Sequence, residues 1–286
     1  MSDTAATKAR ALPHVETPNS TPAHAFAALL LRDLAVLHKN TGEFVARTIM
    51  QPLLFVFVFT YVFPKIGQGV GGTKGEASFS SLLVPGVIAI ACIFQGIQAV
   101  ALPLVQEFGY SREIEDRVMA PMPVWAVAAE KLLAGAVQGL IAAVVVFPLA
   151  IFIPVTTVHL EVNWLHLLTL LPLAALTGAS LGLLIGTRVS PRQVPLVFGL
   201  VVIPITFLGA TYYTWQSLSV IRWLQVLLLA NPLVYMSEGM RVSLLPQSGT
   251  HQVPHMPYWA IYLGLLGFTA LLGGLGIKGF RRRVLS

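Results

Sequence analysis

The sequence predicts an all-α membrane protein with six transmembrane helices, an N-terminal interfacial helix and a re-entrant hairpin before the last span. Hydrophobic residues make up 56% of its 286 residues and charged residues only 10%, whereas roughly a quarter of the residues in soluble domains are charged. The mean hydropathy is +0.77. Six apolar runs approach or reach the length of about 20 residues that crosses a bilayer. Lys and Arg are distributed unevenly between the segments that connect these runs.

The chain begins with a polar segment followed by an amphipathic one. Residues 1–22 are rich in Ala, Thr, Pro and Ser, which predicts a disordered cytosolic tail. They contain no apolar stretch like that of a signal peptide. Over 23–46 the apolar residues Phe26, Leu29 and Leu30 recur at helical spacing with charged residues between them. We expect an interfacial amphipathic helix on the cytosolic surface, and the start of a soluble helix is the alternative.

The remaining residues, 47–286, form one membrane domain in this interpretation. Its six apolar runs are 48–63, 82–105, 132–155, 165–187, 194–214 and 258–277. The first run is short and contains Pro52, so we expect its helix to begin earlier, through Val45. Three glycines recur every four residues in the fourth run: Gly178, Gly182 and Gly186. Small residues at this spacing let two membrane helices approach closely, which predicts a packing role.

The stretch 217–246 does not fit a simple span. Its apolar piece, 223–230, is too short to cross a bilayer and is interrupted by Gln225. Asn231 and Pro232 are a typical cap and first-turn pair, so one short helix should end there and another begin. Glu238 and Arg241 add charge to the second helix. Two half-helices of this kind predict a re-entrant hairpin that dips into the membrane from one side.

Charge counting supports that topology. With six spans and a cytosolic N-terminus, 14 of the 18 Lys and Arg residues lie in inner segments. The outer four are Lys65, Lys74, Arg222 and Arg241. Such a bias is typical of membrane proteins, whose cytoplasmic loops are enriched in Lys and Arg. A seventh span at 217–246 would place the basic run 278–283 outside, so the hairpin is favoured. We expect a multi-pass protein of a prokaryotic cytoplasmic (inner) membrane with both termini cytosolic.

Motifs for catalysis or cofactor binding are not convincing in this sequence. The glycine-rich segment 67–75 fails the spacing of a phosphate-binding loop. His251 and His255 have metal-ligand spacing, but Pro254 lies between them and no Cys or carboxylate is near. Cys92 is the single cysteine, so no intrachain disulfide forms. We therefore expect no enzyme activity, no metal and no cofactor bound by this chain.

Three amides stand out inside the predicted spans: Gln95, Gln98 and Gln138. An amide at membrane depth is costly unless it meets a partner or a wet cavity, so these side chains either line a substrate path or form interhelical hydrogen bonds. No acidic or basic residue lies in the middle of a span. A carrier driven by protons or sodium ions commonly needs such a group, so the energy for any transport should come from elsewhere.

The densest charge lies in the link between spans two and three, 106–124. Six charged residues are concentrated there: Glu107, Arg112, Glu113, Glu115, Asp116 and Arg117. Ile114, Val118 and Met119 are interleaved with them at helical spacing, which predicts a short amphipathic helix that binds a protein partner. A solvated loop is the alternative.

Several stretches in order resemble a known family. They are the surface helix, "LVPGVIAIACIFQG" in span two, "REIEDRVMAPMPVWAVAAEKLLAG" leading into span three, and "NPLVYMSEGMR" before the last span. From about Ala23 to its end the chain resembles the membrane subunit of ABC-2 type exporters, and the drug-resistance and nodulation-factor permeases in particular.

The resemblance implies a homodimer or pseudo-dimer of six-helix subunits that contacts membrane lipid. It also implies that 106–124 acts as a coupling helix docked on a separate ABC ATPase subunit, which would bind ATP and Mg²⁺. The residues to which it gives that coupling role are Arg112, Glu113, Glu115, Asp116 and Arg117. The hairpin residues Asn231, Pro232, Glu238 and Arg241 would lie at the outer mouth of the pathway. No fused ATPase domain is apparent in the sequence.

The function expected from these observations is that of a permease subunit that moves an amphiphilic drug-like or lipid-like substrate out of the cell. Export of a lipid-linked polysaccharide or lipo-oligosaccharide is the alternative. A membrane-embedded enzyme or scaffold is a different class, but an intramembrane enzyme would need His, Asp, Glu or Cys converging at depth, and the sequence shows no such cluster. The basic residues flank the spans, so they predict orientation and not nucleic-acid binding. The substrate itself is not specified by the sequence.

Overall fold

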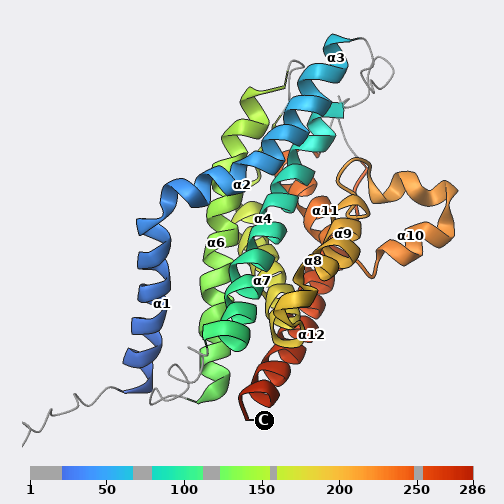
Figure 1. Ribbon diagram of the computed structural model, residues 1–286. Coiled ribbons are helices and arrows are strands. Elements are labelled where there is room, and N and C mark those ends of the chain that lie inside the picture. Colours follow the sequence, from blue (N-terminus) through green and yellow to red (C-terminus); the bar gives the residue numbers. More distant parts are fainter. Residues whose placement is uncertain (1–20, 67–78, 112–122, 155–159, 248–253, 286) are drawn as a thin grey trace, which may run out of the picture.

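The computed structural model describes residues 21–66, 79–111, 123–154, 160–247 and 254–285, and within these ranges the chain is helical and contains no strand. Long helices form a bundle, and the first helix runs along one side of it (Figure 1). The helices are α1 (Pro22–Lys39), α2 (Thr41–Val56), η1 (Phe57–Val62), α3 (Phe63–Lys65), α4 (Phe79–Gln106), η2 (Glu107–Ser111), α6 (Val124–Phe152), α7 (Trp164–Arg188), η3 (Pro191–Gln193), α8 (Val194–Val197), η4 (Phe198–Val202), α9 (Ile203–Phe207), η5 (Trp215–Val220), α10 (Arg222–Leu228), α11 (Pro232–Leu244) and α12 (Tyr258–Leu285).

Five helical runs in the described residues are long and apolar enough to cross a membrane. They are Thr41–Val62, Ser81–Gly109, Val124–Phe152, Trp164–Arg188 and Tyr258–Val284. Each overlaps one of the predicted apolar runs, and the first begins well before residue 48, as its Pro52 suggested. The chain is therefore an all-α protein with several apolar helices of membrane length.

The fifth predicted run, 194–214, is shorter in the structure. Its apolar helix covers Pro191–Phe207 and is divided into α-helical, π-helical and 3-10 turns. Pro195 and Pro204 lie within it and lack the backbone N–H that an α-helix uses. The chain then bends at Ala210, whose φ of 52° is in the left-handed region. These local features explain why an apolar run of 21 residues does not form one straight helix.

The helix α4 lies within the bundle and packs against α6, α7 and α11 (Figure 1). The three glycines of α7 lie directly against its backbone. A Cβ added at Gly182 would lie 2.8 Å from the carbonyl oxygen of Ile97, and one added at Gly178 would lie 3.0 Å from the Cα of Ile93. Close approach of this kind gives van der Waals contact between backbones. The predicted packing role of these glycines is confirmed.

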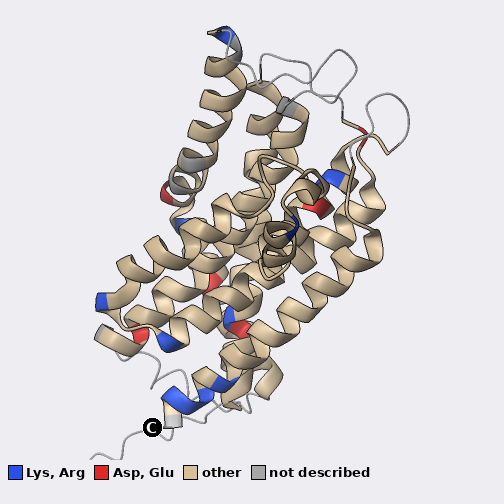
Figure 2. Ribbon diagram, turned by 90° about the vertical axis from the view of Figure 1, so that its right-hand side faces the viewer, with Lys and Arg blue, Asp and Glu red and all other residues tan. Residues whose placement is uncertain are grey.

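The helices α7 and α12 run side by side in the same direction. Thr169 and Tyr262 share a hydrogen bond of 2.7 Å near their beginnings, and Arg283 donates to the carbonyl oxygen of Gly186 over 3.2 Å near their ends. We call the end of the bundle at which both helices begin the hairpin end, and the opposite end the C-terminal end. Phe108 of η2 stacks edge-on against Phe280, so η2 belongs to the C-terminal end. Lys and Arg residues gather toward that end (Figure 2).

The segment from η5 to α11 starts and finishes near the hairpin end. At its start, Gln216 donates to the carbonyl oxygen of His255 over 2.7 Å, just before α12. At its finish, the carbonyl oxygen of Leu244 accepts from Glu161 N over 3.0 Å, just before α7. The two helices α10 and α11 meet at Asn231 and Pro232, where the sequence predicts the boundary. Their position in a membrane stays a prediction, as does the surface position of α1.

Candidate functional site

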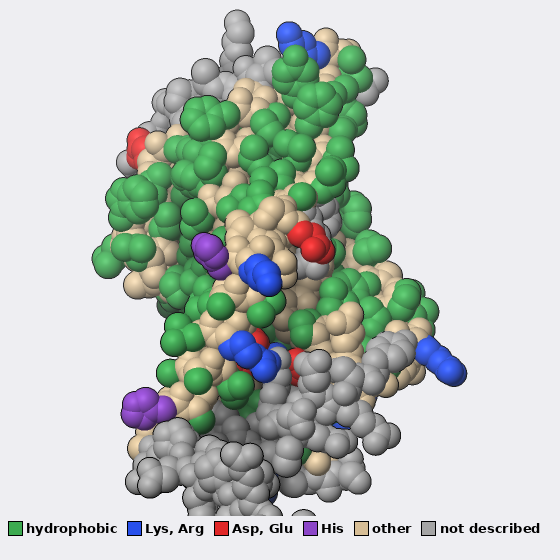
Figure 3. All heavy atoms as spheres, turned by 60° about the vertical axis from the view of Figure 1, so that its left-hand side comes forward, with side chains coloured by type: hydrophobic (Ala, Val, Ile, Leu, Met, Phe, Trp, Pro, Cys, Tyr) green, Lys and Arg blue, Asp and Glu red, His purple; other side chains and the backbone are tan. Residues whose placement is uncertain are grey.

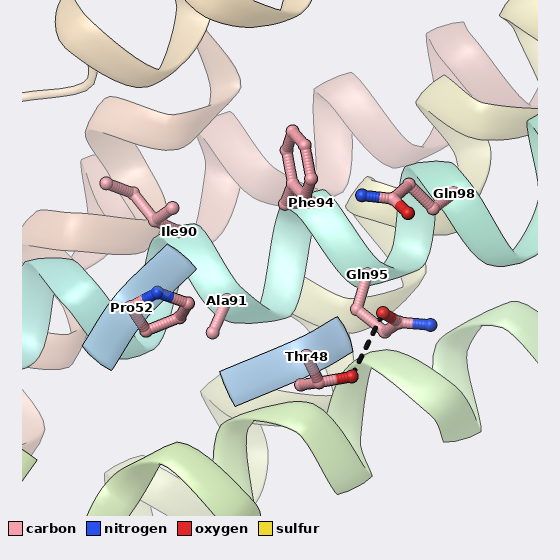
Figure 4. A pocket seen from close by; sticks show the side chains of 7 residues that line it. All are labelled: Thr48, Pro52, Ile90, Ala91, Phe94, Gln95 and Gln98. Atoms are coloured by element: carbon pink, nitrogen blue, oxygen red, sulfur yellow. Dashed lines mark hydrogen bonds between the residues drawn. The ribbon is translucent and has the colours of Figure 1, made fainter. Parts of the chain in front are cut away.

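Two of the three predicted path residues form interhelical hydrogen bonds. Gln95 on α4 is almost fully buried, and its Nε2 donates to Gln138 Oε1 on α6 over 3.4 Å. Thr48 on α2 donates from Oγ1 to Gln95 Oε1 over 3.3 Å. Figure 4 shows Gln95 pointing toward Thr48. These bonds give an amide at depth its partners and connect three helices. A substrate path along Gln95, Gln98 and Gln138 stays a prediction.

Gln98 has different surroundings. It lies on α4 close to Phe94 (Figure 4), and both residues line a small recess beside Thr48. The same two side chains also line a larger hollow of about 580 Å³ between α4 and the α2–η1 run. The other residues around that hollow are apolar: Met50, Leu54, Phe55, Val58 and Phe59. An apolar hollow with one amide in its wall has the character of a small-molecule site. We call it the apolar hollow.

The face of the α2–η1 run beside the apolar hollow is open. Met50, Leu54, Phe57 and Tyr61 are exposed along two successive helical stretches. Figure 3 shows hydrophobic side chains over most of the upper part of one face of the molecule. An exposed apolar surface of this extent contacts lipid or another protein chain.

A buried ion pair lies near the hairpin end. Glu238 and Arg241 are on the same face of α11, with Arg241 Nη1 2.8 Å from Glu238 Oε1 and exposed fractions of 0% and 1%. The guanidinium also donates to the carbonyl oxygens of Ala210 and Thr211. We call these two charged residues the hairpin-end pair.

The carboxylate of Glu238 holds two further segments. Its Oε1 accepts from the backbone N of Trp215 over 2.8 Å, and its Oε2 accepts from the backbone N of Met256 over 3.1 Å. The N-terminal turn of α11 is capped by Asn231, whose Oδ1 accepts from Leu233 N over 2.9 Å. Asn231 Nδ2 donates to the carbonyl oxygen of Ile205 over 2.8 Å. The predicted hairpin residues thus attach α9, the connection after it and the segment before α12 to α11.

A second ion cluster lies near the C-terminal end. Lys131 Nζ on α6 is 3.0 Å from Asp33 Oδ2 on α1 and 3.1 Å from Glu107 Oε1 on η2. The Lys131 side chain is 4% exposed, that of Glu107 7% and that of Asp33 17%. We call these three residues the inner-end cluster. Burial of this degree makes the ion pairs stronger than exposed ones but costly to break.

The five predicted coupling residues lie outside the described residues: Arg112, Glu113, Glu115, Asp116 and Arg117. So do the glycine-rich segment 67–75 and His251. His255 is described, and its Nδ1 lies 2.9 Å from the carbonyl oxygen of Met256. Within the described ranges, no group of three or more His, Cys, Asp and Glu side chains is placed to hold a metal ion.

Comparison with known proteins decides the family. A model of the ABC-2 type transporter family matches residues 24–245, which is more than half of the chain. This chain belongs to the ABC-2 type transporter family. It is similar to the inner membrane transport permease YadH of Escherichia coli strain K12, of Escherichia coli O157:H7 and of Shigella flexneri. Each is 28% identical over 219 residues, which cover 73% of this chain and 78% of the relative.

Family membership identifies the chain as a transport permease, and its described residues include several apolar helices of membrane length. Sequence analysis missed one part of this permease, the inner-end cluster. Asp33 and Lys131 are 98 residues apart, and their places in the sequence indicate only a surface charge and a charge that flanks a span. One signal was available: Glu130 and Lys131 are adjacent charges that interrupt an otherwise apolar helix from Val124. Paired charges in such a helix indicate a buried ionic contact.

Proposed function

We propose that this protein is the permease subunit of an ATP-driven exporter that moves an amphiphilic, drug-like or lipid-like substrate out of the cell. A separate ABC ATPase subunit, with ATP and Mg²⁺, supplies the energy. The apolar hollow is the observation that supports this substrate class. Its wall consists of hydrophobic side chains and the Gln98 amide, a lining that suits an apolar body with one polar group.

Export of a lipid-linked polysaccharide or lipo-oligosaccharide is the alternative. A glycan presents many hydroxyl groups, each of which needs a hydrogen-bond partner when it leaves water. The apolar hollow offers few such partners among its lining residues. The lining therefore favours the amphiphile.

Export can be measured in vesicles that contain the permease and its co-purified ATPase. We expect ATP-dependent movement of a fluorescent amphiphilic dye, and little movement of a fluorescent lipid-linked oligosaccharide. Phe94→Ala should reduce dye transport at least about fivefold, the effect of losing about 1 kcal/mol of aromatic contact. Leu266→Ala, at an exposed position of α12, is the matched control. Transport of the oligosaccharide instead of the dye would favour the alternative.

The energy enters through the link between α4 and α6 in this proposal. Charge reversal by Glu113→Lys together with Glu115→Lys should leave insertion intact and abolish ATP-driven export. The physical reason is that charge pairs set the register of a docked interface, and truncating one partner typically costs about 2–5 kcal/mol. Co-purification of the ATPase and efflux are measured together. Export at the rate of the unmodified protein would exclude a coupling role for these residues.

The proposed topology has six spans, cytosolic termini and a re-entrant hairpin formed by α10 and α11. Two features support it: the hairpin segment starts and finishes near the hairpin end, and Lys and Arg gather toward the C-terminal end. Cysteines placed by Gln247→Cys and Ser286→Cys should react from opposite sides of the membrane. Labelling of both from one side would refute the six-span topology.

The proposed assembly is a homodimer with the pathway between the subunits. The exposed face of the α2–η1 run borders the apolar hollow, so a second copy against it would enclose the hollow from the lipid. The mass of the purified complex in lipid nanodiscs tests this assembly. An active complex with one permease subunit would contradict it.

A further inference from the structure

The inner-end cluster connects three elements that are far apart in the sequence. Lys131 lies in the second turn of α6, Glu107 begins η2 at the end of α4, and Asp33 lies in α1. The ammonium group of Lys131 is shared by both carboxylates, at 3.0 and 3.1 Å. One buried cation therefore holds two helices of the bundle and the helix that precedes it.

Two members of this cluster, Glu107 and Lys131, lie on either side of the charge-dense link 112–122 between η2 and α6 in the sequence. The ion pair between them ties together the two helices through which any displacement of the link would enter the bundle. A pair this buried is costly to separate, because each charge loses its partner before water can replace it.

The third member, Asp33, adds an ionic contact to a helix whose apolar residues Ala25, Phe26 and Leu29 are only partly buried against the core. No described residue of α1 is buried. The helix joins α2 at Asn40, whose φ of −108° and ψ of 27° are not helical. A polar hollow of about 400 Å³ lies between α1, α2, the end of α4 and the middle of α6, and Asp33, Asn40 and Gln106 are among its lining residues. The bend at Asn40 and the hollow beside α1 would therefore let this helix move relative to α2. The ion pair between Asp33 and Lys131 limits that motion.

We propose that Lys131 is a positioning residue for energy coupling, which makes α1, the end of α4 and the start of α6 move as one unit. When the link between η2 and α6 is displaced, the shared ammonium passes the displacement to α1. The assignment rests on the proposed coupling function of the link. It concerns the helices of the permease itself, so it has a test that does not need the ATPase.

The first test measures the distance between α1 and α6 in the permease alone. Spin labels are attached to Leu31→Cys and Leu133→Cys, which replace exposed side chains, while the native Cys92 is buried and does not react. The protein is held in lipid nanodiscs. With Lys131 present we expect one narrow distance population. Lys131→Met should broaden the distribution by at least about twofold, because α1 then samples a second position.

Three variants accompany this measurement. Lys131→Arg keeps a cation that reaches both carboxylates and should restore the narrow population. Asp33→Asn changes only the partly exposed partner, so it should free α1 while the contact between Glu107 and Lys131 keeps α6 folded. Lys39→Met removes an exposed cation of α1 and is the matched control. A narrow population in both Lys131→Met and Asp33→Asn would overturn the proposal.

The second test adds the co-purified ATPase, with ATP and vanadate as the probe that traps its nucleotide-bound state. With Lys131 present, the distance between α1 and α6 should stay constant when the trap forms, because they move together. In Asp33→Asn that distance should change, and transport per ATP hydrolysed should fall at least about fivefold. A changed distance in the unmodified protein would overturn the proposal. If charge reversal in the link leaves export unaffected, the coupling function fails, while the first test still decides whether Lys131 holds α1.

Discussion

The hairpin-end pair and the inner-end cluster are both buried ionic groups, but they differ in their partners. Glu238 and Arg241 lie three residues apart on one helix, and their remaining hydrogen bonds go to backbone groups in two segments, the connection after α9 and the stretch before α12. Lys131 instead bonds to carboxylates carried by two other helices. The hairpin-end pair is formed within one helix, so it persists when helices move, whereas side chains on separate helices separate when those helices move apart.

This difference indicates two mechanical roles for the same kind of interaction. Both side chains of the hairpin-end pair are almost fully buried. We assign this pair the role of stabilising the folded structure by holding loops against α11. The inner-end cluster includes the partly exposed Asp33, which water can hydrate when the contact opens. A contact of that kind opens at a lower cost than one that is fully desolvated.

The largest effect is expected from Arg241→Met. The substitution leaves the Glu238 carboxylate buried without its cation, and a buried pair broken in this way typically loses about 3–5 kcal/mol of stability. Unfolding of the purified protein by SDS in mixed micelles measures the loss. The double variant Arg241→Met with Glu238→Gln removes both charges and should recover part of the stability. Equal loss in both variants would contradict the role of the uncompensated charge.

A smaller effect is expected from Asp33→Asn in the same assay. Asp33 is partly exposed and Lys131 keeps its contact with Glu107. The loss should therefore be about 1–2 kcal/mol, the range of one hydrogen bond to a charged group. A loss of stability as large as that of Arg241→Met would show that the inner-end cluster opens no more easily than the hairpin-end pair.

The smallest effect is expected from Arg32→Gln. Its Nε lies 3.7 Å from Asp33 Oδ1, and 51% of its side chain is exposed. Exposed pairs contribute roughly 0–1 kcal/mol, so SDS-induced unfolding should scarcely change. A marked loss would show that Arg32 belongs to the inner-end cluster after all, and the boundary of that cluster would have to be extended.

Much of the fold follows from patterns that are local in the sequence. Apolar runs in the sequence predicted the five helices of membrane length that the described residues contain. The Asn231–Pro232 pair predicted the break between α10 and α11, because it caps one helix and begins another. The run 194–214 was predicted too long, since hydropathy does not register prolines or the left-handed backbone at Ala210.

The candidate sites were less predictable, because their partners are distant in the chain. The amides of Gln95 and Gln138 were recognised, but only the packing of α4 against α6 shows that they bond to each other. Gln98 lies three residues after Gln95 on the same side of α4, and both line the recess beside Thr48. Only Gln98 also lines the apolar hollow, which depends on how the α2–η1 run packs against α4. The pairing of Asp33 with Lys131 depends on the bend at Asn40, which turns α1 toward α6. The sequence alone does not show this bend, so it gives no reason to pair the two residues.

The glycine contacts along α7 determine which part of the protein is suited as a reference frame for observing movement. Backbone lies against backbone where Gly178 and Gly182 meet α4, so no layer of side chains is present there that could change rotamer and let the helices slide. A pair of spin labels on α4 and α7 should report a constant distance throughout a transport cycle. That distance serves as the reference for distances measured to other helices. Displacements of α1, of the α2–η1 run and of the segment from α10 to α11 can then be expressed as coordinates relative to these two helices.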